Sequence, residues 1–367
     1  MSAVRVVLAG GGTAGHTSPL IATASALAAQ AEVDIVCVGT PKGLETRVIP
    51  AAGLRLALIP PVPLPRRLTP ELFAVPGRLR QAVREARAIL DAHRADVAVG
   101  FGGYVSLPVY LAARQAKVPL VVHEGNAVPG LANRIAARFT PQVATTFAET
   151  RLPHAVHLGL PVRPAIADLD RDARRPAARA GFGLPATGPV LLVSGGSQGA
   201  RSLNLATLEA RERLLAAGIS VLHVLGAANL TPEDVSVTDP ATAAVYRPVG
   251  YVDEMGDAYA AADLMLGRAG AGTVMETAMT GLPTIFVPLP HGNGEQARNA
   301  GFLIAADAGR LVADAELNAD RELSEVTALL ADPARLAAMS AACRRMVPAD
   351  AAERLARLVL AAAQRGD

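Results

Sequence analysis

The sequence predicts an α/β protein with two domains, each built around a parallel β-sheet covered by helices. Apolar runs of strand length alternate with amphipathic segments of helix length along nearly the whole chain, which is the pattern of βαβ units. The chain has 367 residues, more than the roughly 250 to 300 at which a single core stops growing. Hydrophobic residues make up 51% of it and aromatic residues only 3%, so we expect cores packed by Ala, Leu and Val.

Six strands and four helices are predicted in the first half of the chain. Short apolar runs predict the strands, and longer amphipathic segments predict the helices. Pro19 is expected in the first turn of the first helix, where its missing N–H costs no hydrogen bond. The strands are expected at 4–9, 33–38, 55–59, 97–100, 120–123 and 143–146, and the helices at 19–29, 76–93, 107–115 and 130–138.

The periodicity stops between residues 163 and 188, where Arg-Pro-Ala, alternating charges and Pro/Gly predict a hinge. A second series of strands and helices follows, and the chain closes with three helical stretches. The strands are expected at 190–193, 220–225, 245–248, 264–267, 284–288 and 310–312, and the helices at 202–217, 256–261, 273–279, 296–305, 318–330, 333–345 and 349–364.

The sequence carries no membrane-spanning or secretory signal. No run reaches the roughly 18 apolar residues that span a bilayer, and the first strand begins almost at once with Arg5 inside it, unlike a signal peptide. Cys37 lies in a predicted strand and Cys343 in a predicted helix. We therefore expect a cytosolic protein in which both thiols are reduced and structural.

Charge is distributed unevenly. Residues 1–163 hold 17 Lys and Arg against 9 Asp and Glu, and the remainder holds 18 against 24. The basic half favours an anionic partner, either nucleic acid or a membrane face, and the alternative is uneven surface charge with no partner. Residues 66–94 carry seven Arg, next to Leu64, Leu68, Leu72 and Phe73. This mixture predicts a seat on anionic lipid headgroups, the alternative being a loop and an ordinary amphipathic helix.

Two glycine-rich loops, at 10–16 and 194–201, each follow a predicted buried strand and precede a helix. Such junctions expose backbone N–H groups that bind phosphate. The first loop formally matches the dinucleotide fingerprint. The second strand, however, ends in Val38-Gly39-Thr40 without the acidic residue that would hold a ribose, and Asp34 lies at its other end, which disfavours a dehydrogenase. No metal-ligand cluster is found, so neither a metal nor a cofactor is expected.

Polar side chains follow several predicted strands, where the ligand crevice of an open α/β sheet lies. His16 ends the first loop and is a candidate proton acceptor, or a histidine bonded to local backbone. Glu124 and Asn126 follow the fifth strand. Glu276, in the helix after 270–273, is placed for ribose hydroxyls or is ordinary helix N-terminal charge. Residues 102–106 offer amides to a second anion, and 291–296 offer polar groups to a sugar.

Together these motifs resemble the MurG family, the UDP-N-acetylglucosamine (UDP-GlcNAc) dependent glycosyltransferases that convert lipid I to lipid II in bacterial peptidoglycan synthesis. The resemblance covers essentially the whole chain in order. The matching segments are 11–16, 39 with 43–45, 102–106, 123–126, 159–163, 195–201, 251–255, 268–276 and 296–299.

The resemblance implies an α/β protein of the GT-B glycosyltransferase class, with two Rossmann-like domains whose parallel sheets face a cleft. Residues 1–163 would form an acceptor and membrane-side domain, joined by a C-terminal helix at about 349–365, and residues 164–348 a UDP-GlcNAc-binding domain. The reaction would invert the anomeric centre of GlcNAc without a metal or cofactor. The protein would sit peripherally on the cytoplasmic side of the cell membrane, without nucleic acid, beside cell-wall synthesis proteins that serve cell shape and division.

The resemblance also assigns site residues. His16 and Glu124 would face lipid I as candidates for the general base. The donor would be bound by diphosphate contacts from Ser197 and Arg163, uracil contacts from Val252, a ribose contact from Glu276, phosphate-side contacts from Ala271, Gly272 and Thr273, a GlcNAc contact from Gln296, and N-terminal contacts from Thr13, Ala14, Gly15 and Asn126.

Three positions depart from the family pattern, because Ala14, Gly125 and Leu160 stand where the family usually has Gly, Gln and Asn. Ala14 adds a methyl group near the acceptor diphosphate, and the other two remove polar groups beside His123 and Arg163. Two alternatives stay open. One is another UDP-sugar GT-B enzyme, either a glycolipid glycosyltransferase or a UDP-GlcNAc 2-epimerase, and the other is a non-catalytic nucleotide-sugar sensor.

Overall fold

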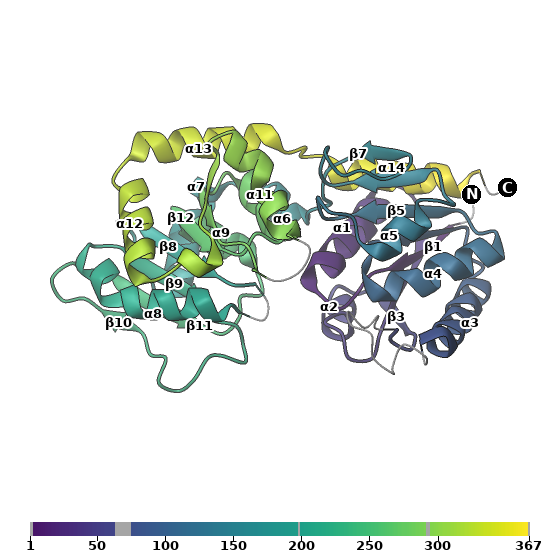
Figure 1. Ribbon diagram of the computed structural model, residues 1–367, viewed down its shortest axis with the longest axis horizontal. Coiled ribbons are helices and arrows are strands. Elements are labelled where there is room, and N and C mark those ends of the chain that lie inside the picture. Colours follow the sequence, from purple (N-terminus) through teal and green to yellow (C-terminus); the bar gives the residue numbers. More distant parts are fainter. Residues whose placement is uncertain (1–2, 63–74, 197–198, 291–293, 366–367) are drawn as a thin grey trace. The chain divides into compact units, whose positions relative to one another are not determined.

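The computed structural model describes residues 3–62, 75–196, 199–290 and 294–365. Its contacts divide the chain into two compact units. The first unit comprises Met1–Arg163 together with Asp350–Asp367, and the second comprises Pro164–Ala349. Figure 1 shows the helices and strands of both units.

The first unit is a seven-stranded, fully parallel sheet in the order β3-β2-β1-β4-β5-β6-β7. Alternate residues of β1 point to opposite faces of this sheet, as the twofold repeat of a strand requires. Val6 and Leu8 pack against α1, α2 and α14, whereas Val7 and Ala9 pack against α3, α4 and α5. The elements are β1 Val4–Ala9, α1 Ala14–Gln30, β2 Val33–Gly39, α2 Glu45–Ala51, β3 Arg55–Leu58, α3 Val75–His93, β4 Val97–Gly100, α4 Gly103–Ala116, β5 Leu120–Glu124, α5 Leu131–Ala136, β6 Gln142–Thr145, β7 Ala155–His157 and α14 Ala351–Ala363.

Helix α14 returns the end of the chain to the first unit. Figure 1 shows it, in yellow, lying against that unit. Leu355, Ala356 and Val359 are buried in the same core as Leu20 and Leu27 of α1. Burial of this apolar face fixes α14 on the sheet, since packing rather than propensity supplies most helix stability in proteins.

The second unit is a seven-stranded sheet in the order β10-β11-β9-β8-β12-β13-β14, parallel except for the β10–β11 pair. β8 lies in the middle of this sheet and pairs in parallel with β12, so the carboxyl ends of β8 and β12 are neighbours. The elements are α6 Pro164–Ala167, α7 Arg171–Phe182, β8 Val190–Ser194, α8 Arg201–Ala216, β9 Ser220–Val224, β10 Val237–Thr238, β11 Val245–Val249, α9 Met255–Ala261, β12 Leu264–Gly267, α10 Ala271–Thr280, β13 Thr284–Phe286, α11 Glu295–Ala305, β14 Gly309–Leu311, η2 Asp314–Glu316, α12 Ala319–Leu330 and α13 Pro333–Met346.

All twelve predicted strands are confirmed to within a few residues, but two helix starts were placed too late. Helix α1 begins at Ala14, so Pro19 is its sixth residue and lies inside the helix rather than in its first turn. Helix α4 begins at Gly103 and likewise holds Pro108 as its sixth residue. Each proline forgoes one helical hydrogen bond. The first turns of both helices contain glycine and polar residues, so hydrophobic periodicity does not reveal where these helices begin.

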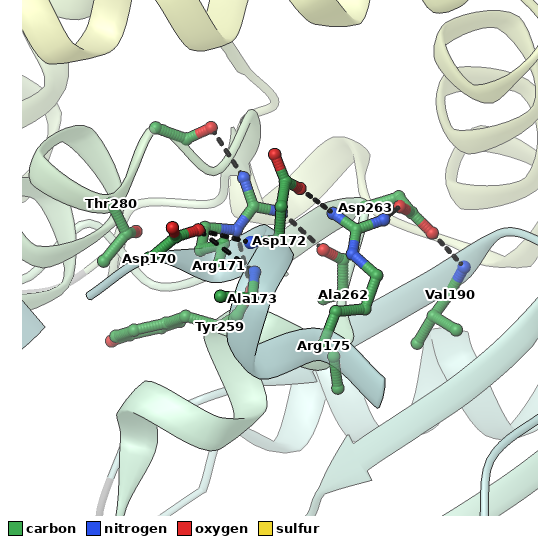
Figure 2. A network of polar contacts seen from close by, with 12 residues as sticks. Asp170, Arg171, Asp172, Ala173, Arg175, Val190, Tyr259, Ala262, Asp263 and Thr280 are labelled. Carbon is green, nitrogen blue, oxygen red and sulfur yellow. Dashed lines mark hydrogen bonds and ion pairs between the residues drawn. The ribbon is translucent and has the colours of Figure 1, made fainter. Parts of the chain in front are cut away.

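The expectation that residues 163–188 lack periodic structure is wrong, because this stretch contains α6 and α7. The division between the two units falls at its start, between Arg163 and Pro164. The inward face of α7 carries arginines in place of apolar residues, which hid its periodicity. Arg175 donates to Asp263 at 2.6 Å (Figure 2). Arg179 donates to the second oxygen of the same carboxylate at 2.9 Å. The hydrogen bonds and ion pairs of these arginines therefore hold α7 in place, as apolar contacts do for an ordinary amphipathic helix.

Cys37 and Cys343 are both buried free thiols. Burial raises the pKa of Cys37 to about 12 and that of Cys343 to about 11, so both are unreactive. This confirms the structural interpretation of the two cysteines. Within the described ranges, no helix combines the length and hydropathy needed to cross a membrane.

Candidate functional site

The first glycine-rich loop joins β1 to α1. Gly12 adopts a φ of +86°, which favours glycine, and Thr13 is the extended N-cap of α1. Ala14, Gly15 and His16 therefore form the first turn of the helix, so His16 does not lie at a loop tip as expected. Among the described residues, no partner is recorded for the N–H groups of Ala14 and Gly15. A helix start of this kind can bind an anion.

A buried carboxylate holds this loop in place. Glu45, the first residue of α2, is 0% exposed. Its Oε2 accepts the N–H of Gly12 at 2.8 Å, and its Oε1 accepts both the N–H and the hydroxyl of Thr40 at 2.9 Å. Burial works to raise the pKa of Glu45, but these hydrogen bonds outweigh it and hold the pKa below its ordinary value. The carboxylate therefore joins the β1–α1 and β2–α2 turns while ionised.

His16 lies half-buried beside this network. Its Nδ1 is 3.1 Å from the Thr13 hydroxyl. A Cβ added at Gly103 would lie 3.4 Å from two ring atoms, so the first turn of α4 packs against the imidazole. Burial lowers the pKa of His16, opposed by a hydrogen bond with the Gly11 backbone and by the charge of Glu45. A neutral imidazole of this kind can accept a proton.

Glu124 ends β5 and is 3% exposed. One oxygen accepts the N–H of Asn126 at 2.9 Å, and the other accepts the N–H of Gly130 and the Asn133 amide, both at 2.9 Å. Burial raises the pKa of Glu124, and these hydrogen bonds oppose the rise. With both oxygens occupied, the carboxylate shapes the turn into α5, and it places Asn126 beside β5.

His123, which precedes Glu124, is fully buried. Its Nε2 lies 3.0 Å from the Gly159 carbonyl oxygen. Burial lowers the pKa of His123 to about 4, so the ring is neutral. The side chain joins β5 to the segment that leads toward Arg163, a half-buried residue at the end of the first unit.

In the second unit, α10 begins at the carboxyl end of β12. Gly270 is its extended N-cap, and Ala271, Gly272 and Thr273 form its first turn, which directs N–H groups outward. Glu276 lies one turn further along and is half-buried. Its Oε2 accepts the hydroxyl of Tyr259 at 2.7 Å. The phosphate-side and ribose-side residues expected from the sequence thus share one helix.

The remaining expected donor residues lie at other strand ends. Gln296 is the second residue of α11, and its Oε1 accepts the Leu289 N–H at 2.9 Å. Val252 is buried between β11 and α9. Ser197, like residues 291–293 of the expected sugar-binding segment, lies outside the described residues.

Arg268 follows β12 and connects it to neighbouring elements of the second unit. Its guanidinium donates to Asp314 at 2.5 Å and to the Ser202 hydroxyl at 2.9 Å, and Ser202 is in the first turn of α8. It also donates to the Val287 carbonyl at 3.1 Å. The ends of β12 and β13 are therefore tied to α8, the helix that follows the second glycine-rich loop.

No individual role was predicted from the sequence for Glu45, Tyr259 or Arg268. Glu45 and Arg268 appeared only inside the family motifs. One signal was available for Glu45. A Cβ at Gly11 or Gly39 would lie 2.5 Å from its side chain, and one at Gly43 would overlap it, so a cluster of glycines marks the buried carboxylate. Nothing in the sequence marks Tyr259.

Across the described part of the chain, no group of three or more His, Cys, Asp or Glu side chains is arranged to hold a metal ion. The chemistry available at these strand ends consists of helix N-termini, a neutral histidine and buried carboxylates. Such groups bind a phosphorylated, hydroxyl-rich ligand.

Two family descriptions match the chain. The glycosyltransferase family 28 N-terminal domain matches residues 6–145, and the family 28 C-terminal domain matches residues 190–355. The chain belongs to glycosyltransferase family 28. The first match lies inside the first unit. The second begins in the second unit and runs on to residue 355 in α14, which belongs to the first unit.

Relatives cover almost the whole chain. The UDP-N-acetylglucosamine--N-acetylmuramyl-(pentapeptide) pyrophosphoryl-undecaprenol N-acetylglucosamine transferase of Cutibacterium acnes is 58% identical over 366 residues, 98% of each chain. The enzyme of the same name from Nocardioides sp. is 56% identical, covering 97% of this chain and 98% of the relative. The predicted resemblance to the MurG family is thereby confirmed.

Solved structures agree with this family. The crystal structure of Acinetobacter baumannii MurG matches with a TM-score of 0.72 at 26% identity, over 98% of this chain and 99% of that one. The glycosyltransferase of kitacinnamycin matches with the same TM-score of 0.72 at 17% identity, over 98% of this chain and 99% of that one, and shows the fold alone. The predicted GT-B class with two Rossmann-like domains is confirmed.

Proposed function

We propose that this protein transfers GlcNAc from UDP-GlcNAc to undecaprenyl-pyrophosphoryl-MurNAc-pentapeptide, lipid I, and so forms the lipid II used for the cell wall. The observation that carries this proposal is the 58% identity, over 98% of both chains, to the relative whose name describes that transfer. The paired glycine-rich loops and the polar side chains at the strand ends support it, because they fit two phosphorylated ligands.

The second unit takes the donor in this proposal. The first turn of α10 directs its N–H groups and its positive dipole end toward the diphosphate, with Ser197 as a further contact. Arg163, at the end of the first unit, also contacts the diphosphate. Glu276 accepts the ribose hydroxyls, Val252 contacts the uracil, and Gln296 holds hydroxyls of GlcNAc. From the first unit, Thr13, Ala14, Gly15 and Asn126 contact the donor.

His16 is the proton acceptor in this mechanism. A hydroxyl oxygen of the MurNAc sugar attacks the anomeric carbon of GlcNAc and forms the new glycosidic bond. The bond from that carbon to the phosphate oxygen breaks at the same time, and UDP leaves with the electron pair. The hydroxyl proton passes to His16, whose lowered pKa keeps the ring neutral. Glu124 is a positioning residue, since N–H groups occupy both of its oxygens.

A lipid acceptor requires the protein to reach a membrane, and we place that contact on α3. The apolar face of α3 is buried through Ala82, Val83, Ala86 and Leu90, so this face of the helix is not available to lipid. The exposed cations of the helix, Arg78, Arg80 and Arg84, can contact anionic headgroups. The apolar patch expected from Leu64, Leu68, Leu72 and Phe73, with Arg66 and Arg67, lies outside the described residues. Docking would occur peripherally at the cytoplasmic face, beside other cell-wall synthesis proteins.

Donor consumption tests this proposal against the alternatives. A transferase consumes UDP-GlcNAc and releases UDP in proportion to added lipid I, and leaves the donor intact without it. A UDP-GlcNAc 2-epimerase would convert the donor with no acceptor present, and a nucleotide-sugar sensor would bind it without turnover. Release of UDP that does not depend on lipid I would contradict the proposal.

A further inference from the structure

Tyr259 is a buried tyrosine whose hydroxyl reaches the carboxylate of Glu276. It lies in α9 and is 2% exposed. The hydroxyl donates to Oε2 of Glu276 at 2.7 Å, a length expected for a hydrogen bond to a charged group. A buried tyrosine hydroxyl needs a polar partner, and here that partner lies on a different helix, α10.

A second contact fastens α9 to α10 at their carboxyl ends. The Arg171 guanidinium, on a residue that is 6% exposed, donates to the backbone oxygens of Tyr259 at 3.0 Å and Ala262 at 2.5 Å; Figure 2 labels these three residues. It also donates to the backbone oxygen of Gly281 at 2.8 Å. Ala262 and Gly281 are the C-caps of the two helices. A cation at this point is favourable because both helix dipoles end there.

These contacts give α9 a defined position relative to α10. Arg171 holds the backbone of Tyr259, and the side chain of Tyr259 in turn holds Glu276. An unrestrained glutamate side chain would lose rotational freedom when it binds a ligand. A glutamate already held by Tyr259 meets the ligand with less of this loss, which is the advantage of preorganisation.

We propose that Tyr259 is a positioning residue for donor binding, which orients the Glu276 carboxylate so that it recognises the ribose of a uridine nucleotide and rejects the 2′-deoxy sugar. This rests on the assignment of Glu276 to ribose in the proposed function. Tyr259 touches the carboxylate and not the nucleotide, so its effect appears only with ligands whose hydroxyls Glu276 binds.

Two ligands and three variants test the proposal. Affinities for UDP and 2′-deoxy-UDP are measured by calorimetry on the full chain and on Tyr259→Phe, which removes one hydroxyl and keeps the buried ring. Tyr246→Phe is the matched control. Tyr246 is also fully buried in the second unit, and its hydroxyl lies 3.0 Å from Nδ1 of His223. Glu276→Ala removes the carboxylate and gives the ratio of the two affinities when the ribose contact is absent.

We expect Tyr259→Phe to weaken UDP binding on the order of tenfold, the effect of losing one hydrogen bond to a charged group. Binding of 2′-deoxy-UDP, which keeps the 3′-hydroxyl and lacks the 2′-hydroxyl, should weaken less, so the ratio of the two affinities should fall. Tyr246→Phe should keep the native ratio. In turnover, the donor KM should rise while kcat and the acceptor KM are retained.

An equal loss for both ligands, or an unchanged ratio, would assign Tyr259 to fold stability and overturn the proposal. If the native chain bound UDP but did not prefer it to 2′-deoxy-UDP, the ribose role of Glu276 would fail, and the positioning role with it. If the native chain bound neither ligand, the proposed function itself would fail. These results are distinguishable from one another.

Discussion

The carboxylate of Glu45 accepts the backbone N–H of Gly12 at 2.8 Å. This contact joins the start of α2 to the loop that precedes α1, the helix that carries His16 in its first turn. Thr40 donates two further hydrogen bonds to the same carboxylate. The N–H and O–H groups of Gly12 and Thr40 donate to the buried Glu45 carboxylate, and these hydrogen bonds stabilise its negative charge. We infer that Glu45 sets the position of the first glycine-rich loop.

Replacement of Glu45 by Gln should lower kcat by about tenfold or more, since a glutamine amide cannot accept hydrogen bonds at both ends and displaces the loop. The change also removes the negative charge that raises the pKa of His16. If neutral His16 is the base, the acidic limb of the kcat–pH profile should move to lower pH. Glu32→Gln, at an exposed position of the same unit, is the control. An unshifted kcat–pH profile would show that the charge of Glu45 does not affect the pKa of His16 as the base.

His16→Ala should lower turnover by roughly 10²-fold, the scale of a lost general base. UDP binding should change little, because most of the proposed donor contacts lie in the second unit. Thr13→Val, which removes only the hydroxyl 3.1 Å from Nδ1, should cost much less. Stopped-flow or steady-state measurement of lipid product decides the matter. Near-native turnover of His16→Ala would reassign proton transfer, with Glu124 as the next candidate.

Glu322 should make the second unit less stable as pH rises. The side chain is 1% exposed, and the Thr207 hydroxyl lies 3.0 Å from each of its oxygens. Burial raises the pKa of Glu322 to about 8, from 4.5 without the fold. The folded chain therefore keeps a proton that the unfolded chain releases, and the stability from this group, complete below about pH 4.5, is lost as pH rises to about 8.

Glu322→Gln should remove this dependence, which amounts to roughly 1 kcal/mol per pH unit. Calorimetric unfolding at pH 5.5 and 7.5 measures it, and the variant should gain most at the higher pH. Glu325→Gln, on the same helix and paired with Arg321 at 2.8 Å, serves for comparison. Equal pH slopes in the native chain and in Glu322→Gln would show that the carboxyl is ionised in the fold.

Membrane attachment should depend on the cations of α3. A variant with Arg78, Arg80 and Arg84 changed to Ser should bind anionic vesicles more weakly, because each arginine near such a surface contributes on the order of 1 kcal/mol. Binding of the native chain should fall with added salt. The control changes Arg213, Arg321 and Arg345, exposed cations of the second unit, to Ser. Equal losses in both variants would show a general charge effect and place the contact elsewhere.

The sequence predicted the strands well and the helix faces less well. Apolar runs such as Val190–Ser194 are visible because buried parallel strands are apolar on both faces. Helix α7 was missed because its inward residues are Arg171, Arg175 and Arg179, which bind carbonyl and carboxylate oxygens. Hydrophobic periodicity cannot reveal a helix whose inward face consists of arginines.

The candidate site shows the same division. The sequence predicted Glu276 in a helix, as the structure has it, whereas it predicted His16 at the end of a loop and the structure has this residue in the first turn of α1. Their neighbours Glu45 and Tyr259 act through contacts between residues 33 and 17 positions apart, and only the fold brings these together. The glycines around Glu45 are visible in the sequence. Their cause, the space that the buried Glu45 side chain occupies, is visible only in the structure.

One measurement tests the proposed transfer most directly. UDP-GlcNAc labelled in the sugar is incubated with a lipid I analogue and the native chain, and the lipid fraction is analysed for label and for anomeric configuration. The account predicts a labelled lipid-linked disaccharide with an inverted, β-configured bond, formed in equal amount to the UDP released. Label that remains in the nucleotide sugar, or appears in free sugar with no lipid product, would contradict it.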